Sequence, residues 1–566
     1  MTADLLAYPP LLLLIGAAVI ALAPRPVGVA AIFLAPLAAL WAVWTAPEGV
    51  MLSAPYLDLT LEVMEVSPVR RLFAIVFTLM TLVGGLFAFR QAARTELAAA
   101  FAYAGSALGI CFAGDLLTLF LFWEMLAIFS TIVIWSGGTE KSRAAGQRYA
   151  VLHLLGGLVL MAGILGLWSN TGSLDIRVLT DQLGTLSGWL VLGGVLINVA
   201  APPLSAWLAD AYPEASATGT VFLSAYTTKA AVLVLILLFP GATILIGVGL
   251  YMVFYGIIYA LLENDARRIL AYSIVNQVGF MVTAVGIGTE VALNGAAAHA
   301  FAHIIYKALL LMSAGVVLYR TGRSKCTDLG GLFQTMPVTA ICGIIGALAI
   351  SSFPFTSGFT TKTMISEAAH MEGLVAVYFL LAAASAGVFL HAGIKFPWFV
   401  FFQKDSGLRP KDAPWNMAAA MIFFAVLCVF FGLYPDPLYA LLPYPVEFEA
   451  YKAAKLVFYF QLLLFSGLAF FLLLPWMKRT ETVSLDTDWL YRVALHGLAR
   501  RVMAGVAGAA SAVATSASGV ARQVMAVAER VASGSGALAR SWSVAGSALI
   551  VSAMLSLYIL AYYLTA

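Results

Sequence analysis

The hydrophobic positions of the chain gather into long apolar runs, and short polar segments separate these runs. A helix needs about 20 apolar residues to cross the hydrocarbon core of a bilayer. The pattern predicts an all-α polytopic membrane protein with about 16 transmembrane helices. The runs lie near residues 9–23, 27–45, 72–90, 97–113, 115–135, 149–168, 188–209, 218–238, 242–262, 268–288, 291–319, 337–370, 373–402, 416–434, 455–475 and 545–565.

Two of these runs contain helix breakers at membrane depth. Pro202 and Pro203 follow Asn198 in the seventh run, and the segment SSFPFTSGF places Pro354 and Gly358 in the twelfth. Unwound backbone at that depth is tolerated only where it lines a cavity or is covered by protein. Broken helices 7 and 12, five spans apart, are typical of a transporter built from two inverted repeats. Two ordinary proline kinks are the alternative.

A different kind of segment, residues 491–542, lies between the last two runs and is rich in Ala, Ser and Gly. Its valines recur at helical spacing, which predicts an amphipathic lateral helix along the cytoplasmic surface, about 75 Å long if continuous. Such a helix could strap the bundle or a neighbouring subunit. The alternative is a flexible linker, because the segment contains five glycines. The valines are Val502, Val506, Val513, Val520, Val524, Val527 and Val531, and the glycines are Gly505, Gly508, Gly519, Gly534 and Gly536.

The composition agrees with a chain whose solvent is mostly lipid, because 62% of its 566 residues are hydrophobic and 10% are charged. This balance excludes the soluble classes of protein. The formal net charge of +3 is too small to predict nucleic acid as a partner. Cys111, Cys326, Cys342 and Cys428 form no C-x-x-C pair and no Cys/His spacing typical of zinc, haem or iron–sulfur sites. We therefore expect no metal and no cofactor.

The basic residues are distributed unequally between the two sets of loops. One set carries sixteen Lys and Arg residues, whereas the other carries five, namely Arg70, Arg71, Arg177, Lys452 and Lys455. The positive-inside rule predicts that the richer set is cytoplasmic. Both termini are then expected on the non-cytoplasmic side.

Four ionisable residues lie inside or at the edge of apolar runs: Glu124, Lys229, Lys307 and Lys362. A charge near the centre of a bilayer costs roughly 2.5 to 3.5 kcal/mol on insertion scales, so such residues are functional candidates by default. Glu124 needs a cationic partner to stay ionised, and Lys229 is the best candidate in the same half of the chain. A pair that opens and closes with the proton load of a neighbouring lysine would act as an electrostatic switch. The alternative is a static buried ion pair.

His299, His303 and Lys307 follow one another at intervals of four residues, so they share one face of one helix over about 12 Å. This stripe can hold a chain of waters, and both residue types can pass a proton on near neutral pH. His153, His391 and Lys395 also lie at membrane depth. For these three, a place on the proton pathway and a snorkelling or capping role both remain open.

At these residues the sequence resembles the antiporter-like, proton-conducting membrane subunits of respiratory complex I and of Mrp-type cation/proton antiporters, particularly the D-type subunits of the Mrp antiporters. The resembling stretches cover about residues 100 to 400 in the family's order. They are FWEM around Glu124, PPLSAWLADAYPEAS, TTK ending at Lys229, ENDARRILAYSIVNQVGFM, HAFAHIIYKALLLMSAG, DLGGLFQTMP, and FPFTSGFTTK ending at Lys362. The C-terminal segment is similar to the lateral helix of the most distal complex I antiporter-like subunit.

The resemblance implies a role for each candidate site residue. Glu124 would be the carboxylate of the fifth span and Lys229 its partner. The central relay would consist of His299, His303 and Lys307, and Lys362 would end the second half-channel. The resemblance also implies a division into N-terminal helices (1–96), a first half-channel repeat (97–238), a second half-channel repeat (239–402), peripheral helices (403–476), the lateral helix (477–544) and a final span (545–566).

The sequence departs from the family pattern in the seventh run. Family members usually carry a lysine where this chain has Asn198, and the histidine and last proline of their P-x-H-x-W-L-P motif are Ser205 and Ala209 here. Asparagine cannot hold a transferable proton. The first half-channel then depends on Lys229 or does not conduct continuously.

The sequence thus predicts a proton-translocating membrane subunit of a multisubunit Mrp-like or complex I-like assembly in the bacterial inner membrane. Its expected partners are other membrane subunits, protons, lipid and, if it is an antiporter, Na⁺ or another small ion. The main alternative is a non-conducting scaffold that keeps the fold, for which Asn198 is the argument. A redox subunit is the third class, but the chain has no motif for a catalytic centre, so electron chemistry would belong to partners.

Overall fold

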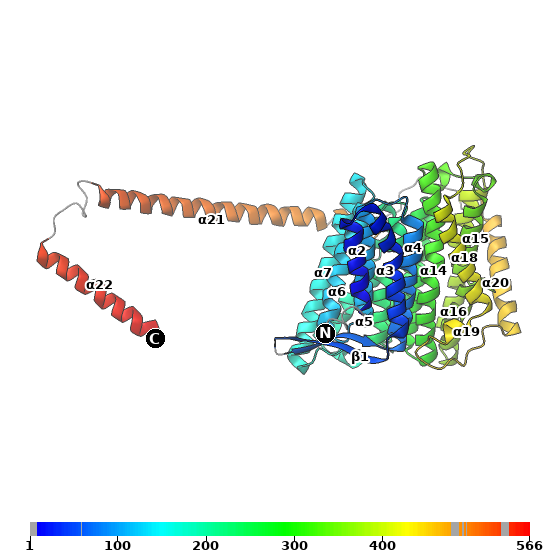
Figure 1. Cartoon of the computed structure of the whole chain (residues 1–566), viewed down its shortest axis with the longest axis horizontal. Helices are drawn as coiled ribbons and strands as arrows, with labels where there is room; N and C mark the ends of the chain where they lie inside the picture. The colour runs from blue at the N-terminus through cyan, green and yellow to red at the C-terminus, as the bar shows by residue number, and fades with distance from the viewer. Residues whose placement is uncertain are drawn as a thin grey trace. The chain divides into compact units, whose positions relative to one another are not determined.

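The computed structural model describes residues 8–57, 59–476, 486–489, 492–493, 495–533 and 543–565. The chain forms two compact units, Met1–Asp488 and Trp489–Ala566. The first unit is a bundle of helices with one two-stranded sheet (Figure 1). The described residues of the second unit include two long helices.

The first part of the bundle contains α2 (Pro9–Leu22), α3 (Arg25–Thr45), α4 (Pro68–Ala88), α5 (Arg94–Phe112), α6 (Leu116–Trp135) and α7 (Glu140–Thr171). Local sequence sets several of these boundaries. The Asp115 carboxylate accepts hydrogen bonds from the first backbone amides of α6, and Thr139 and Ser142 form a capping box at the start of α7. Gly172, in the left-handed conformation, ends α7.

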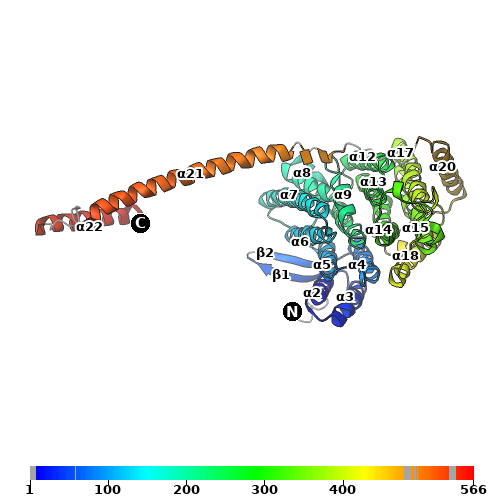
Figure 2. The same cartoon turned by 90° about the horizontal axis from the view of Figure 1, so that it is seen from above.

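The middle part begins with η1 (Thr180–Gly184), α8 (Leu186–Val199), α9 (Trp207–Ala211), η2 (Tyr212–Glu214), α10 (Gly219–Leu223) and α11 (Thr227–Leu238). It continues with α12 (Ile244–Leu262), α13 (Ala266–Ile287) and α14 (Glu290–Thr321). Both α13 and α14 lie in the interior of the bundle: α14 packs against α13, α4, α15, α16 and α18 (Figure 2). Polar side chains in the middle of α14 are therefore surrounded by protein.

The last part of the bundle contains η3 (Cys326–Asp328), η4 (Leu332–Gln334), α15 (Pro337–Ile350), α16 (Ser357–Met371) and α17 (Val375–Val388). Two π-helical turns, η5 (Phe389–Lys395) and η6 (Trp398–Phe402), continue α17. The unit then adds α18 (Trp415–Leu433), α19 (Asp436–Tyr439) and α20 (Ala453–Leu472). A π-turn widens the helix by one residue and is frequent at functional sites.

Twelve helices among the described residues are long and apolar enough to cross a membrane, and four shorter apolar helices accompany them. Each of the sixteen predicted runs overlaps one of these helices, so the positions of the apolar segments agree with the sequence. Which of the shorter helices complete a span, and therefore the number of sixteen, stays a prediction.

The prediction of a purely helical chain was wrong between α3 and α4. There the chain forms an antiparallel hairpin of β1 (Gly49–Tyr56) and β2 (Leu59–Val66). The period-two alternation of LTLEVMEV is typical of a strand, but the segment lies outside the apolar runs. The hairpin is held to the bundle because the Gly114 amide donates to the Glu62 carbonyl (2.8 Å).

The structure breaks both runs that contain prolines at membrane depth. The seventh run stops being helical after Val199, where Ala200 takes a positive φ of 64°, and the twelfth stops after Ile350. A third break, between Leu223 at the end of α10 and Thr227 at the start of α11, was not predicted. The relation of the two halves as inverted repeats stays a prediction.

The second unit contains α21 (Leu495–Ala532) and α22 (Val544–Thr565). The 38 residues of α21 form one continuous helix across Gly505, Gly508 and Gly519, so the described part of this segment is a helix and not a linker. Gly534 and Gly536 lie outside the described residues. The position of this helix along a membrane surface stays a prediction.

Candidate functional site

Two buried lysines of the predicted site lie at breaks in helices. The Lys229 ammonium donates to the Ser224 carbonyl (2.6 Å) and to the Thr228 hydroxyl (3.1 Å), and Ser224 directly follows α10. The Lys362 ammonium donates to the carbonyl of Ile350 (2.7 Å), the last residue of α15. The last carbonyls of a helix have no intrahelical donor. Each break therefore supplies an acceptor where a buried ammonium needs one.

Lys307 completes a group of three buried lysines. Its ammonium donates to the Leu270 carbonyl of α13 (3.3 Å). The Lys362 ammonium also lies 4.8 Å from the centre of the Phe280 ring, a cation–π distance. The side chains of Lys229, Lys307 and Lys362 are fully buried. The bundle interior thus contains three amines with polar or aromatic neighbours.

His299 is the centre of a hydrogen-bonded cluster that joins three helices. Its Nδ1 is 3.1 Å from the Thr361 hydroxyl of α16, and its Nε2 is 3.2 Å from Gln277 Oε1 of α13. The Tyr306 hydroxyl donates to Gln277 Oε1 (3.1 Å) and lies 3.2 Å from His299 Nε2. The cluster connects the predicted relay to Lys362, the residue next to Thr361.

The sequence did not identify Gln277 and Tyr306 as part of the site. Tyr306 is seven residues from His299, a spacing that brings both to the same face of a helix. The helical periodicity could therefore have identified Tyr306 as a neighbour of His299. Gln277 lies on another helix, and local sequence contains no comparable signal for it.

His303 lies beside this cluster with both ring nitrogens buried and without a hydrogen-bond partner. Its ring is 6.2 Å from the His299 ring and 5.2 Å from the Tyr306 ring, between ring centres. α14, which carries His299, His303 and Lys307, contacts α11, which carries Lys229, and α16, which carries Lys362. The structure therefore places five of the six predicted site residues on α14 and on two helices that contact it.

Glu124, the sixth predicted residue, lies at the interface of α6 and α7. Its Oε1 is buried and has no hydrogen-bond partner. The carboxylate packs on Gly157 so closely that a methyl group added there would lie 1.8 Å from Oε1. Glu124 and Lys229 do not form an ion pair among the described residues, because the Lys229 ammonium contacts Ser224 and Thr228 instead. The structure thus keeps the two members of the predicted switch apart.

A second polar cluster surrounds Asn198 at the end of α8. Both polar atoms of the fully buried Asn198 amide lack a partner. The Trp207 indole donates to the Ile197 carbonyl (2.9 Å), and its ring lies 4.5 Å from the His153 ring. His153 Nδ1 is 3.0 Å from the Tyr149 carbonyl, and its Nε2 has no partner. Buried polar groups of this kind are usually paired, often with water.

Tyr149 connects this cluster to the segment that contains Lys229. Its hydroxyl lies 2.9 Å from the Ser130 hydroxyl and 3.4 Å from the Thr227 hydroxyl. Thr227 in turn lies 2.5 Å from the Tyr103 hydroxyl and is followed by Thr228, which accepts from Lys229. A series of hydroxyl groups therefore runs from α6 and α7 to α11.

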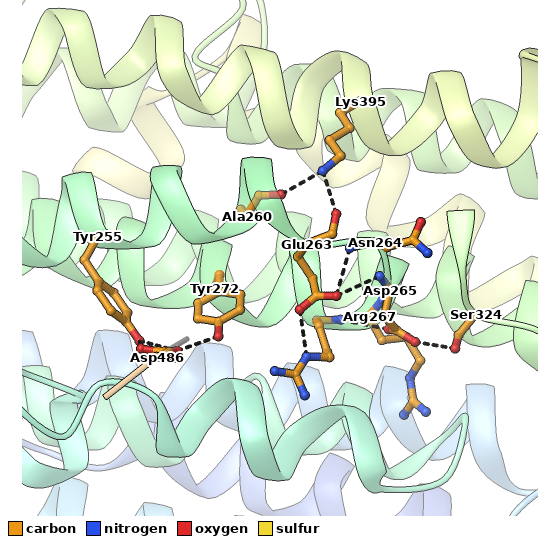
Figure 3. A network of polar contacts seen from close by, with 11 residues as sticks. Tyr255, Ala260, Glu263, Asn264, Asp265, Arg267, Tyr272, Ser324, Lys395 and Asp486 are labelled. Atoms are coloured by element: carbon orange, nitrogen blue, oxygen red, sulfur yellow. Dashed lines mark hydrogen bonds and ion pairs between the residues drawn. The ribbon is translucent and has the colours of Figure 1, made fainter. Parts of the chain in front are cut away.

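A third polar network lies where α12 ends (Figure 3). Lys395, on the π-turn η5, donates to the carbonyls of Leu261 (2.6 Å) and Glu263 (2.6 Å) and to that of Ala260 (3.2 Å). Its role was left open by the sequence, and the contacts are those of an ammonium that caps a helix. The Lys395 contacts therefore fix η5 to the end of α12.

In the same view, Asp486 accepts hydrogen bonds from Tyr255 (2.8 and 2.9 Å) and from Tyr272 (2.6 Å). The Asp486 side chain is buried, and it belongs to the first unit. No group of three or more His, Cys, Asp or Glu side chains suited to a metal occurs in the part of the chain that the structure describes.

Comparisons with known proteins agree with this arrangement. The family described as "NADH:quinone oxidoreductase/Mrp antiporter, TM" matches residues 113–390. The D subunit of the Na⁺/H⁺ antiporter of Alkalihalophilus pseudofirmus is 30% identical over 350 residues, which cover 58% of this chain and 71% of that protein. The M subunit of the NADH-quinone oxidoreductase of Pseudomonas aeruginosa is 28% identical over 360 residues, 59% of this chain and 70% of that protein.

A solved structure has the same fold. A chain of the Mrp complex from Dietzia sp. DQ12-45-1b superposes with a TM-score of 0.71 at 21% identity, over 78% of this chain and 97% of that one. The matched family region contains all six predicted site residues. The resemblance seen in the sequence is confirmed: the chain is a polytopic membrane protein, and it belongs to the family of antiporter-like membrane subunits shared by NADH:quinone oxidoreductases and Mrp antiporters.

Proposed function

We propose that this chain is a proton-translocating subunit of a multisubunit membrane complex of the Mrp or complex I type. One observation carries the proposal: α14 carries two histidines and a lysine, all fully buried, and it contacts α11 and α16, which carry the buried Lys229 and Lys362. Buried ionisable groups at membrane depth are costly and mark ion or proton pathways. Relatives named as the D subunit of a Na⁺/H⁺ antiporter and the M subunit of an NADH-quinone oxidoreductase support the same assignment.

In the proposed pathway, a proton passes between Lys229 and Lys362 through the relay on α14. Each lysine can hold the proton because a backbone carbonyl accepts from its ammonium. His303 can take a proton at one ring nitrogen and release one at the other, since both are unpartnered. His299 then connects through Thr361 to the helix of Lys362. The proposed relay thus consists of residue types that can exchange protons.

Glu124 would control how strongly Lys229 holds its proton. A carboxylate near an ammonium stabilises the charged form, and separation of the pair makes the proton easier to release. The arrangement described above, with Glu124 on Gly157 and Lys229 on Ser224, corresponds to the separated state. Closure of the pair in another state completes the proposed switch. Exchange of the proton for Na⁺ or another small ion would be a property of the whole assembly and not of this chain alone.

The proposed setting is the bacterial inner membrane, among other membrane subunits and lipid. The loops with the larger number of basic residues face the cytoplasm, and both termini face the other side. The alternative function is a scaffold that has lost conduction. Asn198 favours this alternative, because an amide cannot carry a proton where the first half of the bundle is broken.

Substitution of Glu124 and Lys229 tests the proposal. The intact complex is reconstituted into vesicles, a potassium diffusion potential is imposed with valinomycin, and proton uptake is followed with a pH-sensitive dye. We expect Glu124→Gln and Lys229→Ala to reduce proton flux by about 100-fold or more, because each removes a proton-transferring or charge-stabilising group. The polypeptide composition of the complex should not change.

Lys411→Ala is the matched control, since it removes an exposed lysine in a loop and should keep the wild-type flux. Wild-type flux in both Glu124→Gln and Lys229→Ala would favour the scaffold.

A further inference from the structure

We propose that His153 carries the proton in the first half of the bundle, and that it exchanges this proton with Glu124. The inference rests on the proposed function and adds a residue to it. Asn198 has no ionisable nitrogen, whereas His153 does, and both side chains are buried without a complete set of hydrogen-bond partners. Four observations place His153 in this role.

The first observation concerns the protonation of the imidazole. Nδ1 of His153 lies 3.0 Å from the Tyr149 carbonyl, which can only accept. Nδ1 therefore donates, so the neutral ring keeps its lone pair on Nε2. Nε2 is buried and has no hydrogen-bond partner in the protein. The side chain is 1% exposed. The hydrogen bond thus presents a basic nitrogen inside the bundle, at a fixed position.

The second observation is the position of Glu124. Its carboxylate packs on Gly157, and a methyl group at Gly157 would lie 1.8 Å from Oε1. His153 precedes Gly157 by four residues on α7, so both lie on the same face about 6 Å apart along the axis. In the proposal, water between the two side chains carries the proton. Glu124 Oε1, like His153 Nε2, has no partner in the protein.

The third observation links His153 to the break after α8. The Trp207 ring is edge-on to the His153 ring, and the Trp207 indole donates to the carbonyl of Ile197, the residue before Asn198. The Ile197 side chain also faces Gly156, next to Gly157, because a methyl group at Gly156 would lie 3.2 Å from it. The cluster around α7 therefore brings His153 and Glu124 to the level of Asn198.

The fourth observation is a connection toward Lys229. The His153 ring stacks on the Tyr149 ring with 3.8 Å between centres. The Tyr149 hydroxyl lies 3.4 Å from Thr227, and the next residue, Thr228, accepts from the Lys229 ammonium. The histidine therefore packs on one member of the hydroxyl series that leads toward Lys229.

The proposed step is a proton transfer with no other change. The proton leaves Nε2 of the His153 imidazolium and, through water, joins a carboxylate oxygen of Glu124. The imidazolium becomes a neutral imidazole, and the carboxylate becomes a neutral carboxyl group. The reverse transfer reloads the histidine. Since the carboxylate loses its charge in this step, the transfer also weakens its hold on the Lys229 ammonium.

The test compares His153→Gln with His153→Gln/Asn198→Lys in the intact, reconstituted complex, with the proton-flux assay described above. Glutamine keeps a hydrogen-bonding side chain but cannot carry a proton, so we expect a loss of about 100-fold. Lysine at position 198 restores an ionisable nitrogen in the same cluster. The double variant should therefore recover most of the flux. If His153→Gln does not assemble, His153→Asn takes its place in the same comparison.

His391→Gln is the matched control. His391 has the same pattern, with Nδ1 at 2.9 Å from the Gly387 carbonyl and an unpartnered Nε2, but it lies on η5 in the second half. Asn198→Lys should leave the flux of His391→Gln unchanged. Recovery in the His153 background alone would show a specific replacement of the lost proton carrier.

Two results would overturn the role of His153. One is wild-type flux in His153→Gln. The other is a loss that Asn198→Lys does not repair in a complex of normal polypeptide composition, which would mean that His153 only supports packing. Both differ from failure of the proposed function itself. That failure would appear as wild-type flux in Glu124→Gln and Lys229→Ala.

Discussion

At the scale of single residues, Gly157 determines where the Glu124 carboxylate lies. Glu124 reaches the surface of α7 only because position 157 has no side chain. Sequence analysis identified Glu124 from the cost of a charge in an apolar run, but it did not predict the contact with Gly157. The sequence shows the glycine but contains no signal that links it to a residue on another helix. Its contact with the Glu124 carboxylate therefore could not be predicted.

We expect Gly157→Ala to reduce proton flux by on the order of 10- to 100-fold, because the new methyl group displaces the carboxylate from its place on α7. The measurement is proton uptake in vesicles at equal amounts of assembled complex. Gly193→Ala, on the neighbouring α8, is the control, because a methyl group there meets nothing closer than 4.0 Å. Equal flux in both variants would contradict the importance of the Glu124 position.

The lysines show which residue-scale features the sequence can predict. Lys229, Lys307 and Lys362 were found because ionisable residues are rare in apolar runs. Their acceptors were not found, since these are carbonyls of Ser224, Leu270 and Ile350 that become available only through the folded backbone. Residue type was therefore predictable, and hydrogen-bond partners were not.

At the scale of elements, the breaks and the π-turns matter most. Prolines predicted the breaks after α8 and α15. The break before α11 contains Ser224, Ala225 and Tyr226, none of which is a strong helix breaker, so its cause lies in packing. The π-turn η5 likewise has no sequence signal. It presents Lys395 to the end of α12, where three carbonyls bind the ammonium.

The network of Asp486, Tyr255 and Tyr272 fixes Asp486 to α12 and α13. It joins residues 231 and 214 positions apart, so local sequence could not predict it. We expect Asp486→Ala to increase cleavage by trypsin at Arg492 about 10-fold or more, because hydrogen bonds to a charged group contribute about 1.5 to 3 kcal/mol each. The rate is followed by mass spectrometry of the folded complex.

Asp405→Ala is the control for this experiment. Asp405 is an exposed acid whose ion pair with Arg409 lies in a loop, and exposed pairs contribute little to stability. Cleavage at Arg492 should therefore stay at the wild-type rate. Equal rates in the Asp405 and Asp486 variants would mean that the tyrosines do not hold this segment.

At the scale of the whole molecule, hydropathy predicted the positions of the apolar segments well, because lipid imposes a minimum length on every span. It missed the β1–β2 hairpin, which lies outside those segments. The orientation of the bundle rests on the count of basic residues in the loops. It is testable because all four native cysteines are buried.

We expect Leu57→Cys to react with a membrane-impermeant maleimide in intact cells, and Lys411→Cys to react only after the membrane is opened. Leu57 is 86% exposed at the tip of the hairpin, and Lys411 lies in a loop of the set richer in basic residues. Labelling is measured by the mass of the purified chain. The opposite pattern would reverse the proposed orientation.

The carbonyl contacts of the buried lysines have a consequence for genetics. Substitution can delete an amine at position 229 or 362, but no codon change deletes the main-chain oxygen that receives it. A mutational scan would thus measure the effect of losing the lysine but not the effect of losing the carbonyl that it contacts. Replacement of the peptide bond by an ester, which weakens the carbonyl as a hydrogen-bond acceptor, would measure the contribution of the main-chain oxygen. Chemical synthesis or genetic-code expansion can introduce such an ester.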